Sequence, residues 1–171
     1  MNVVETLTAR NADFAAGHFT PGLRLMPSLK TIVIGCVDPR VDPNEVLGAK
    51  AGEIATLRNV GGRVTPELLM ELMMLRKVTQ AFGGDIGPGW EFIVLHHTDC
   101  GITRLEEQPE VLSDFFGVDE EELDELHVGD PRAAVTRDVA TLRSDNRLAG
   151  VRVSGLVYDV TSGTVETVAA P

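Results

Sequence analysis

The segment TIVIGCVDPR, residues 31–40, decides the fold of this chain because a short apolar run leads directly into residues that carry chemistry. The run is rich in β-branched residues and lacks alternating polar positions, as is typical of a parallel strand buried on both faces. A second segment of the same design, FIVLHHTDCG, occupies residues 92–101. The chain has two cysteines, and each follows one of these runs. The two segments therefore predict two buried strands that lead into cysteine-containing motifs.

Helical patterns alternate with strand patterns along the rest of the chain. Asp42, Thr65 and Asp130 are good N-caps, and each is followed by a proline that suits the first helical turn. Glu45, three residues after Asp42, also predicts a capping box. The expected helices cover residues 2–19, 43–47, 66–82 and 131–146, and the expected strands cover 31–35, 54–57, 91–96, 151–157 and 164–168. This order predicts βαβ units, a mostly parallel α/β sheet and a final hairpin-paired strand.

The composition is ordinary for one soluble globular domain of 171 residues. Fifteen basic and 26 acidic side chains give a net charge of −11, which argues against nucleic acid or an anionic membrane as partner. The densest acidic run, residues 118–127, is expected to be a solvated helix face or loop. No apolar stretch approaches the roughly 18 residues of a membrane span, and the first ten residues show no secretory signal. Two distant cysteines then predict a reducing, cytoplasmic location and thiolate chemistry, with a disulfide as the competing interpretation.

Cys36, His97 and Cys100 are the candidate metal ligands. Thiolates and an imidazole favour zinc over magnesium or calcium, whereas copper and iron remain possible on ligand type alone. Three protein ligands leave one tetrahedral position open, which is the layout of a catalytic zinc site. His96 is the alternative imidazole, but neighbouring strand residues face opposite ways and His97 lies closer to Cys100. Ligands of parallel sheets bind at the carboxyl ends of the strands, so the site forms if the two strands are neighbours.

Asp38 and Arg40 stand two residues apart around Pro39, which favours extended backbone at the residue before it. Side chains at i and i+2 of an extended segment point the same way, so the guanidinium can hold the carboxylate ionised beside Cys36. Asp38 could accept a hydrogen bond from metal-bound water or take the fourth metal position itself. The simpler alternative is a surface ion pair of little energetic value. Two thiolates cancel the charge of zinc, so bound water should be less acidic than in a three-histidine site and activity should need alkaline pH.

These residues resemble the signature motifs of the β-class carbonic anhydrases. The matching motifs are Cys36-x-Asp38-x-Arg40, Arg58-Asn59-x-Gly61-Gly62 and His97-x-x-Cys100-Gly101, in the family's order and at similar spacing. The resemblance covers most of the chain and is closest to the short bacterial members. It implies a three-layer α/β fold with a central, mostly parallel sheet of about four strands and an antiparallel edge strand. It also implies a single domain over residues 1–171.

The resemblance further implies an activity and a set of roles. The activity is the reversible hydration of carbon dioxide to bicarbonate and a proton by zinc-bound hydroxide. The roles are zinc binding by Cys36, His97 and Cys100, a catalytic dyad of Asp38 and Arg40, and substrate binding by Gly101. Family members are homodimers or dimers of dimers, so residues 1–28, an N-terminal helix and arm, are expected to pack on a partner subunit. Pro39 departs from the small residue usual in the family and should stiffen the dyad.

Three other functions are compatible with the same residues. Some relatives hydrolyse carbonyl sulfide or carbon disulfide at this kind of site, and the motifs do not separate those substrates from carbon dioxide. A non-catalytic zinc-stabilised dimer or binding module would keep the metal ligands without needing Asp38 and Arg40. A redox protein using Cys36 and Cys100 is disfavoured because the sequence has no C-x-x-C motif.

Overall fold

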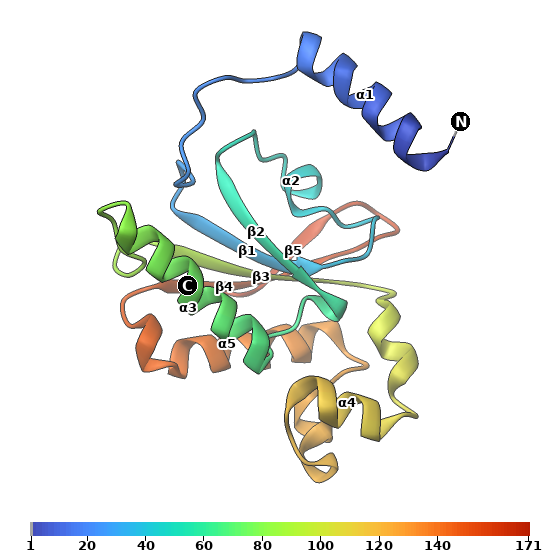
Figure 1. Cartoon of the computed structure of the whole chain (residues 1–171). Helices are drawn as coiled ribbons and strands as arrows, with labels where there is room; N and C mark the ends of the chain where they lie inside the picture. Colours follow the sequence, from blue (N-terminus) through green and yellow to red (C-terminus); the bar gives the residue numbers. More distant parts are fainter. Residues whose placement is uncertain (1) are drawn as a thin grey trace.

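Five strands form one sheet in the computed structural model, which describes residues 2–171. The strands lie in the order β2-β1-β3-β4-β5 (Figure 1). Their bounds are β1 (Thr31–Cys36), β2 (Ile54–Asn59), β3 (Glu91–His97), β4 (Arg152–Tyr158) and β5 (Val165–Ala169). Adjacent strands from β2 to β4 are parallel, and β5 runs antiparallel to β4. The predicted mostly parallel sheet with an antiparallel edge strand is therefore confirmed.

The strands β1 and β3 are neighbours at the centre of the sheet. Gly35 of β1 is in register with Leu95 of β3, and every residue of β1 is buried. A central parallel strand is covered on both faces, which explains the unbroken apolar run at residues 31–35. The condition for a site shared between the two cysteine motifs is thus met.

Helices on both sides of the sheet complete the predicted three layers (Figure 1). The helices α3 (Pro66–Ala81) and α5 (Pro131–Ser144) pack on one face. The short α2 (Pro43–Val46) lies on the other side, where a Cβ on Gly35 would be 3.0 Å from the ring of Pro43. The main core includes Ile34, Leu68, Leu72, Phe92, Val94, Val135 and Val139.

The N-caps of these helices follow the prediction with one exception. The side chains of Thr65 and Asp130 accept hydrogen bonds from amides in the first turns of α3 and α5. Asp42 caps α2 through the amide of Asn44, the second helical residue, rather than through the third. The capping box predicted with Glu45 is therefore wrong.

Residues 101–127 form a small helical module. Within this range, only the acidic run was predicted, as a solvated helix face or loop. The module consists of η2 (Gly101–Leu105), α4 (Pro109–Phe116) and η3 (Glu120–Leu126). The acidic side chains of η3 are exposed, as predicted, but Leu126 is buried. A second apolar cluster joins the module to the ends of β1 and β3 through Cys36, Val41, Cys100, Ile102, Leu112, Phe116, Leu126 and Val128. Two short 3-10 turns, η1 (Val60–Gly62) and η4 (Asn146–Leu148), follow β2 and α5.

The helix α1 (Val3–Gly17) stands apart from the sheet (Figure 1). None of its residues is buried, and an irregular connection over residues 18–30 joins it to β1. The exposed apolar side chains of this region are Val3, Val4, Leu7, Phe14, Phe19, Leu23, Leu25 and Leu29. The packing of residues 1–28 on a partner stays a prediction, and residue 1 lies outside the described residues. Within residues 2–171, neither α1 nor any other helix combines the length and apolar character needed to cross a membrane.

Candidate metal centre

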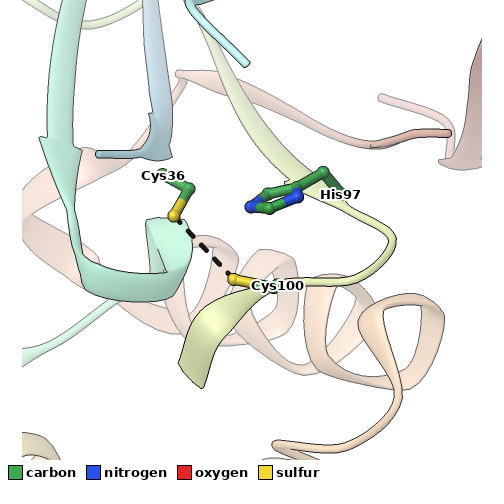
Figure 2. Close-up of side chains that lie close together, drawn as sticks. All are labelled: Cys36, His97 and Cys100. Atoms are coloured by element: carbon green, nitrogen blue, oxygen red, sulfur yellow. Dashed lines mark hydrogen bonds between the residues drawn. The ribbon is translucent and has the colours of Figure 1, made fainter. Parts of the chain in front are cut away.

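Cys36, His97 and Cys100 meet at the carboxyl edge of β1 and β3 (Figure 2). One donor atom of each residue lies within 4.8 Å of the other two, and the two sulfur atoms are 3.8 Å apart. All three side chains are buried. Cys36 and His97 were expected just beyond their strands, whereas they are the final residues of β1 and β3. The structure thus brings together the three residues that were predicted as metal ligands.

The backbone around Cys36 depends on two glycines of the loop motif. Gly61 and Gly62 have φ values of 79° and 65°, a region that residues with a Cβ rarely adopt. A Cβ on Gly62 would also lie only 2.8 Å from the amide nitrogen of Cys36. This close approach lets the amide of Gly61 stabilise the Cys36 sulfur, which the amide of Asp38 also approaches at 3.4 Å. The two glycines therefore help to position Cys36 and to favour its thiolate form.

His97, and not His96, faces the cysteines. The Nδ1–H of His97 donates to the carbonyl oxygen of Thr98 at 2.9 Å, which leaves Nε2 as the nitrogen that can bind a metal. Nε2 is buried and has no hydrogen-bond partner within residues 2–171. A backbone carbonyl on the other ring nitrogen is the usual way to orient a metal-binding histidine. His96 points elsewhere, and its Nε2–H donates to the carbonyl oxygen of Gly62 at 3.2 Å.

The pKa values of the two cysteines are shifted in opposite directions. A hydrogen bond from the Cys100 thiol, supported by backbone amides, lowers the pKa of Cys36 to about 4 against the opposing effect of burial. The same pairing, together with burial, raises the pKa of Cys100. Burial lowers the pKa of His97, but the neighbouring charge of Cys36 contributes to a net rise. The backbone amides near Cys36 therefore favour this residue as the first thiolate of the pair.

The donor spacing fits zinc. Two sulfur atoms bound at about 2.3 Å to one tetrahedral zinc lie about 3.8 Å from each other. The sulfur atoms of Cys36 and Cys100 have this separation, 3.8 Å. The free Nε2 of His97 completes a soft donor set of the kind that zinc prefers to harder cations.

Asp38 and Arg40 form a bidentate pair beside Cys36. Arg40 Nη2 lies 2.7 Å from Asp38 Oδ2, and Arg40 Nε lies 3.1 Å from Asp38 Oδ1. These hydrogen bonds are the main cause that lowers the pKa of Asp38 to about 2, so the carboxylate is ionised at neutral pH. The pairing expected from the spacing is present, while the role of the pair in catalysis stays a prediction.

Arg58 binds the backbone of the segment that carries Cys36 and Asp38, a role that the sequence did not predict. Its guanidinium donates to the carbonyl oxygens of Cys36 and Asp38 and to the carboxylate of Asp42, each at 2.8 Å. Asp99 contacts Arg40 along another edge of the guanidinium and was also not predicted to take part. The signal for Asp99 was its place between two of the candidate metal ligands.

A buried charge network lies behind the metal centre. Arg63 Nε donates to Asp138 Oδ2 at 2.8 Å, and His96 Nε2 lies 3.3 Å from the same oxygen. Arg63 is 1% exposed, and Asp138 is 2% exposed. The network ties α5 to the residue that follows the Gly61–Gly62 turn. The network therefore helps to fix the loop of Gly61 and Gly62, which packs against the backbone of Cys36.

Gly101, the residue predicted to bind substrate, begins η2 directly after Cys100. It is exposed, and beyond the neighbouring residues of the chain no atom lies within 4 Å of the position that a Cβ would take. The structure places it at the rim of the centre, and its role stays a prediction.

Known proteins resemble this chain in sequence. Residues 31–117 match the family model for carbonic anhydrase. The β-carbonic anhydrase 1 of Mycobacterium tuberculosis (strain ATCC 25618 / H37Rv) is 35% identical over 102 residues, which cover 60% of this chain and 57% of that protein. This chain thus spans less than two thirds of that relative's length. A carbon disulfide hydrolase of Acidianus sp. (strain A1-3) is 28% identical over 154 residues, which cover 75% of this chain and 72% of that protein.

Solved structures resemble the fold along nearly its whole length. A carbonic anhydrase from Streptococcus mutans superposes with a TM-score of 0.75 at 30% identity, covering 98% of both chains. The apo form of a carbon disulfide hydrolase superposes with a TM-score of 0.60 at 25% identity, covering 95% of this chain and 88% of that one. The matched family region, residues 31–117, contains the clustered residues and the Asp38–Arg40 pair.

Proposed function

The chain belongs to the β-class carbonic anhydrase family, and we propose on this premise that it is a zinc enzyme for the reversible hydration of carbon dioxide to bicarbonate and a proton. One observation carries the proposal: an ionised Asp38 is held by Arg40 directly beside a three-donor cluster. A structural zinc site is normally closed by four protein ligands, whereas three leave room for a reacting molecule.

Cys36, Cys100 and the Nε2 atom of His97 would hold the zinc ion. When bound, zinc supplies Lewis acidity that activates water for attack on carbon dioxide. The hydrogen bond from His97 Nδ1–H to Thr98 fixes the imidazole ring, and the amides beside Cys36 favour its thiolate. The centre is therefore preorganised by this chain's own backbone before a metal arrives.

Asp38 acts on the reacting water in this proposal. Its carboxylate accepts a hydrogen bond from that water and orients it, while Arg40 keeps the carboxylate ionised. Because two thiolates neutralise the zinc charge, the rate of hydration should rise toward alkaline pH. Gly101 leaves open space next to Cys100, and this space would admit carbon dioxide.

The protein is proposed to work as one domain in a homodimer or a dimer of dimers. The exposed apolar side chains of α1 and the following arm are suited to contact a second copy of the chain. The free, buried thiols at the metal centre suit a reducing location such as the cytoplasm.

Stopped-flow hydration of carbon dioxide tests the proposal. Protein with about one zinc per chain should accelerate hydration at about pH 8.5, and Asp38→Ala should lower kcat by about 100-fold. Asp85→Asn is the matched control, because it removes an exposed, arginine-paired carboxylate that lies before the amino end of β3, whereas the site lies at the carboxyl end. Zinc-loaded protein without measurable hydration would contradict the proposal, and full activity of Asp38→Ala would contradict the role of Asp38.

Hydrolysis of carbon disulfide is the second candidate function. It is favoured by the carbon disulfide hydrolase relative, whose match covers more of this chain than that of the carbonic anhydrase relative. Release of hydrogen sulfide from carbon disulfide or carbonyl sulfide, measured beside hydration on the same zinc-loaded sample, separates the two. A non-catalytic zinc-stabilised dimer would bind zinc and turn over none of the three substrates.

A further inference from the structure

Asp99 contacts the arginine of the dyad along a different edge of the guanidinium from Asp38. Arg40 Nη1 donates to Asp99 Oδ2 at 2.9 Å, and Arg40 Nη2 donates to the carbonyl oxygen of Asp99 at 3.0 Å. Asp38 is bound through Nε and the other N–H of Nη2. An arginine side chain has five N–H donors in a fixed plane, so the two aspartates use different donors and do not compete for Arg40.

The backbone of Asp99 directs this contact. Its φ is 53°, in the left-handed region where aspartate and asparagine are more common than other residues with a Cβ. The turn lies between His97 and Cys100, so the bend that returns Cys100 toward His97 also presents Asp99 to Arg40. Arg40 consequently links the motif after β1 to the motif after β3.

The second contact matters because Arg40 is exposed. Its side chain is 48% accessible to solvent, and an isolated pair at such a site is weak because a long side chain must give up rotamer freedom. Asp99 restricts the guanidinium from a second direction. Because the Arg40 side chain is already restricted by Asp99, its pairing with Asp38 costs less conformational entropy.

We propose that Asp99 is a positioning residue that keeps Asp38 engaged with Arg40 and so keeps the fourth metal position open to an external ligand. The inference rests on the proposed metal site. Asp38 follows Cys36 by two residues, so its carboxylate is an internal competitor for that position. Loss of the Asp99 carboxylate weakens the contact that orients Arg40, so Asp38 is released more often and can occupy the position.

Azide binding to cobalt(II)-substituted protein, followed by visible absorption, tests the inference without measuring catalysis. Asp99→Asn keeps the size, the backbone carbonyl and a tolerance for positive φ, and removes the carboxylate. Azide affinity should fall by about tenfold, the order expected for one charge-assisted hydrogen bond. Removal of a negative charge alone would strengthen the binding of an anion, so the expected change has the opposite sign to a simple charge effect.

Two further variants make the outcome decisive. Asp85→Asn removes the same charge from an exposed pair with Arg76, at 2.7 Å, and should leave azide affinity unchanged. In an Asp38→Ala background, Asp99→Asn should no longer weaken azide binding, because the competing carboxylate is gone and only the strengthening effect of the removed charge remains. Unchanged or stronger azide binding in Asp99→Asn, or an equal loss in the Asp38→Ala background, overturns the inference. A parent that binds cobalt and azide but hydrates no carbon dioxide overturns the proposed activity and leaves the positioning role standing.

Discussion

At the scale of single residues, the structure distinguishes two adjacent histidines that have opposite surroundings. His97 presents a free Nε2 to Cys36 and Cys100, while His96 binds the Gly62 carbonyl and approaches Asp138. Alternation along a strand predicts that one histidine faces the cysteines, and the spacing to Cys100 favoured His97. The hydrogen bond that orients each ring could not be predicted, because its acceptor is fixed by turns and by a loop distant in sequence.

Substitution of the two histidines separates these surroundings. His97→Ala should lower bound zinc from about one per chain to well below one, because one of three donors is lost. His96→Leu should keep the zinc and lower the free energy of unfolding by about 1–3 kcal/mol, because its buried partners lose a hydrogen bond. Metal analysis after dialysis, with urea unfolding of the same samples, checks both. Full zinc content in His97→Ala, or equal loss in both variants, would disprove the assignment.

At the scale of elements, strands were predicted better than the segment that covers the metal centre. The apolar run of β1 and the N-cap–proline starts of α3 and α5 are local signals, and all are present in the fold. Residues 101–127 were missed because α4 has only eight residues and the elements on either side of it are 3-10 turns, so no long apolar period marks the segment. Two signals were available there, Pro109 in the first turn of α4 and Gly117, with φ of 64°, at its end.

The buried ion pair between Arg63 and Asp138 joins the loop after β2 to α5. Burial raises the pKa of Asp138, but the hydrogen bond from His96 and the charge of Arg63 outweigh burial and lower the pKa. A carboxyl whose folded pKa is lowered stabilises the fold above its unfolded pKa of about 3.9, and this stabilisation is lost as pH falls toward the folded value.

Asp138→Asn should therefore destabilise the protein strongly at neutral pH and less in acid. We expect a loss of about 3–5 kcal/mol at pH 7, because Arg63 stays buried without its counter-charge. The difference from the parent should shrink below about pH 4. Urea unfolding at several pH values measures it, with Asp85→Asn as the exposed-pair control. A difference that is independent of pH would show that the charge of Asp138 is not the cause.

At the scale of the whole molecule, α1 is the helix that buries none of its residues against the rest of the chain. Val3, Leu7 and Phe14 share one side of α1 by helical spacing and are all exposed. Exposed apolar side chains that share one side are suited to the contact with a second copy of the chain that we propose. Local pattern could predict the helix, but the identity of what covers it depends on assembly.

Charged residues on this side of α1 should break the proposed dimer. The double variant Leu7→Glu/Phe14→Glu should elute at the monomer mass in size-exclusion chromatography with light scattering, because two charges would be buried at the contact. Ala9→Glu, on the opposite side of α1, is the control and should keep the parent's mass. A parent that is monomeric at micromolar concentration, or a double variant that stays dimeric, would contradict the assignment of α1 to the partner.

The sequence by itself determined the ligand types, the two strand-to-motif transitions and the alternating order of strands and helices. These features depend on neighbouring residues, so composition and spacing carry them. Only the tertiary structure decided that β1 and β3 are adjacent, that the sulfur atoms of Cys36 and Cys100 lie 3.8 Å apart, and that Asp99 binds Arg40. Each of these contacts joins residues more than 50 positions apart. Such contacts follow from the order of strands in the sheet and the direction of turns, which no local pattern records.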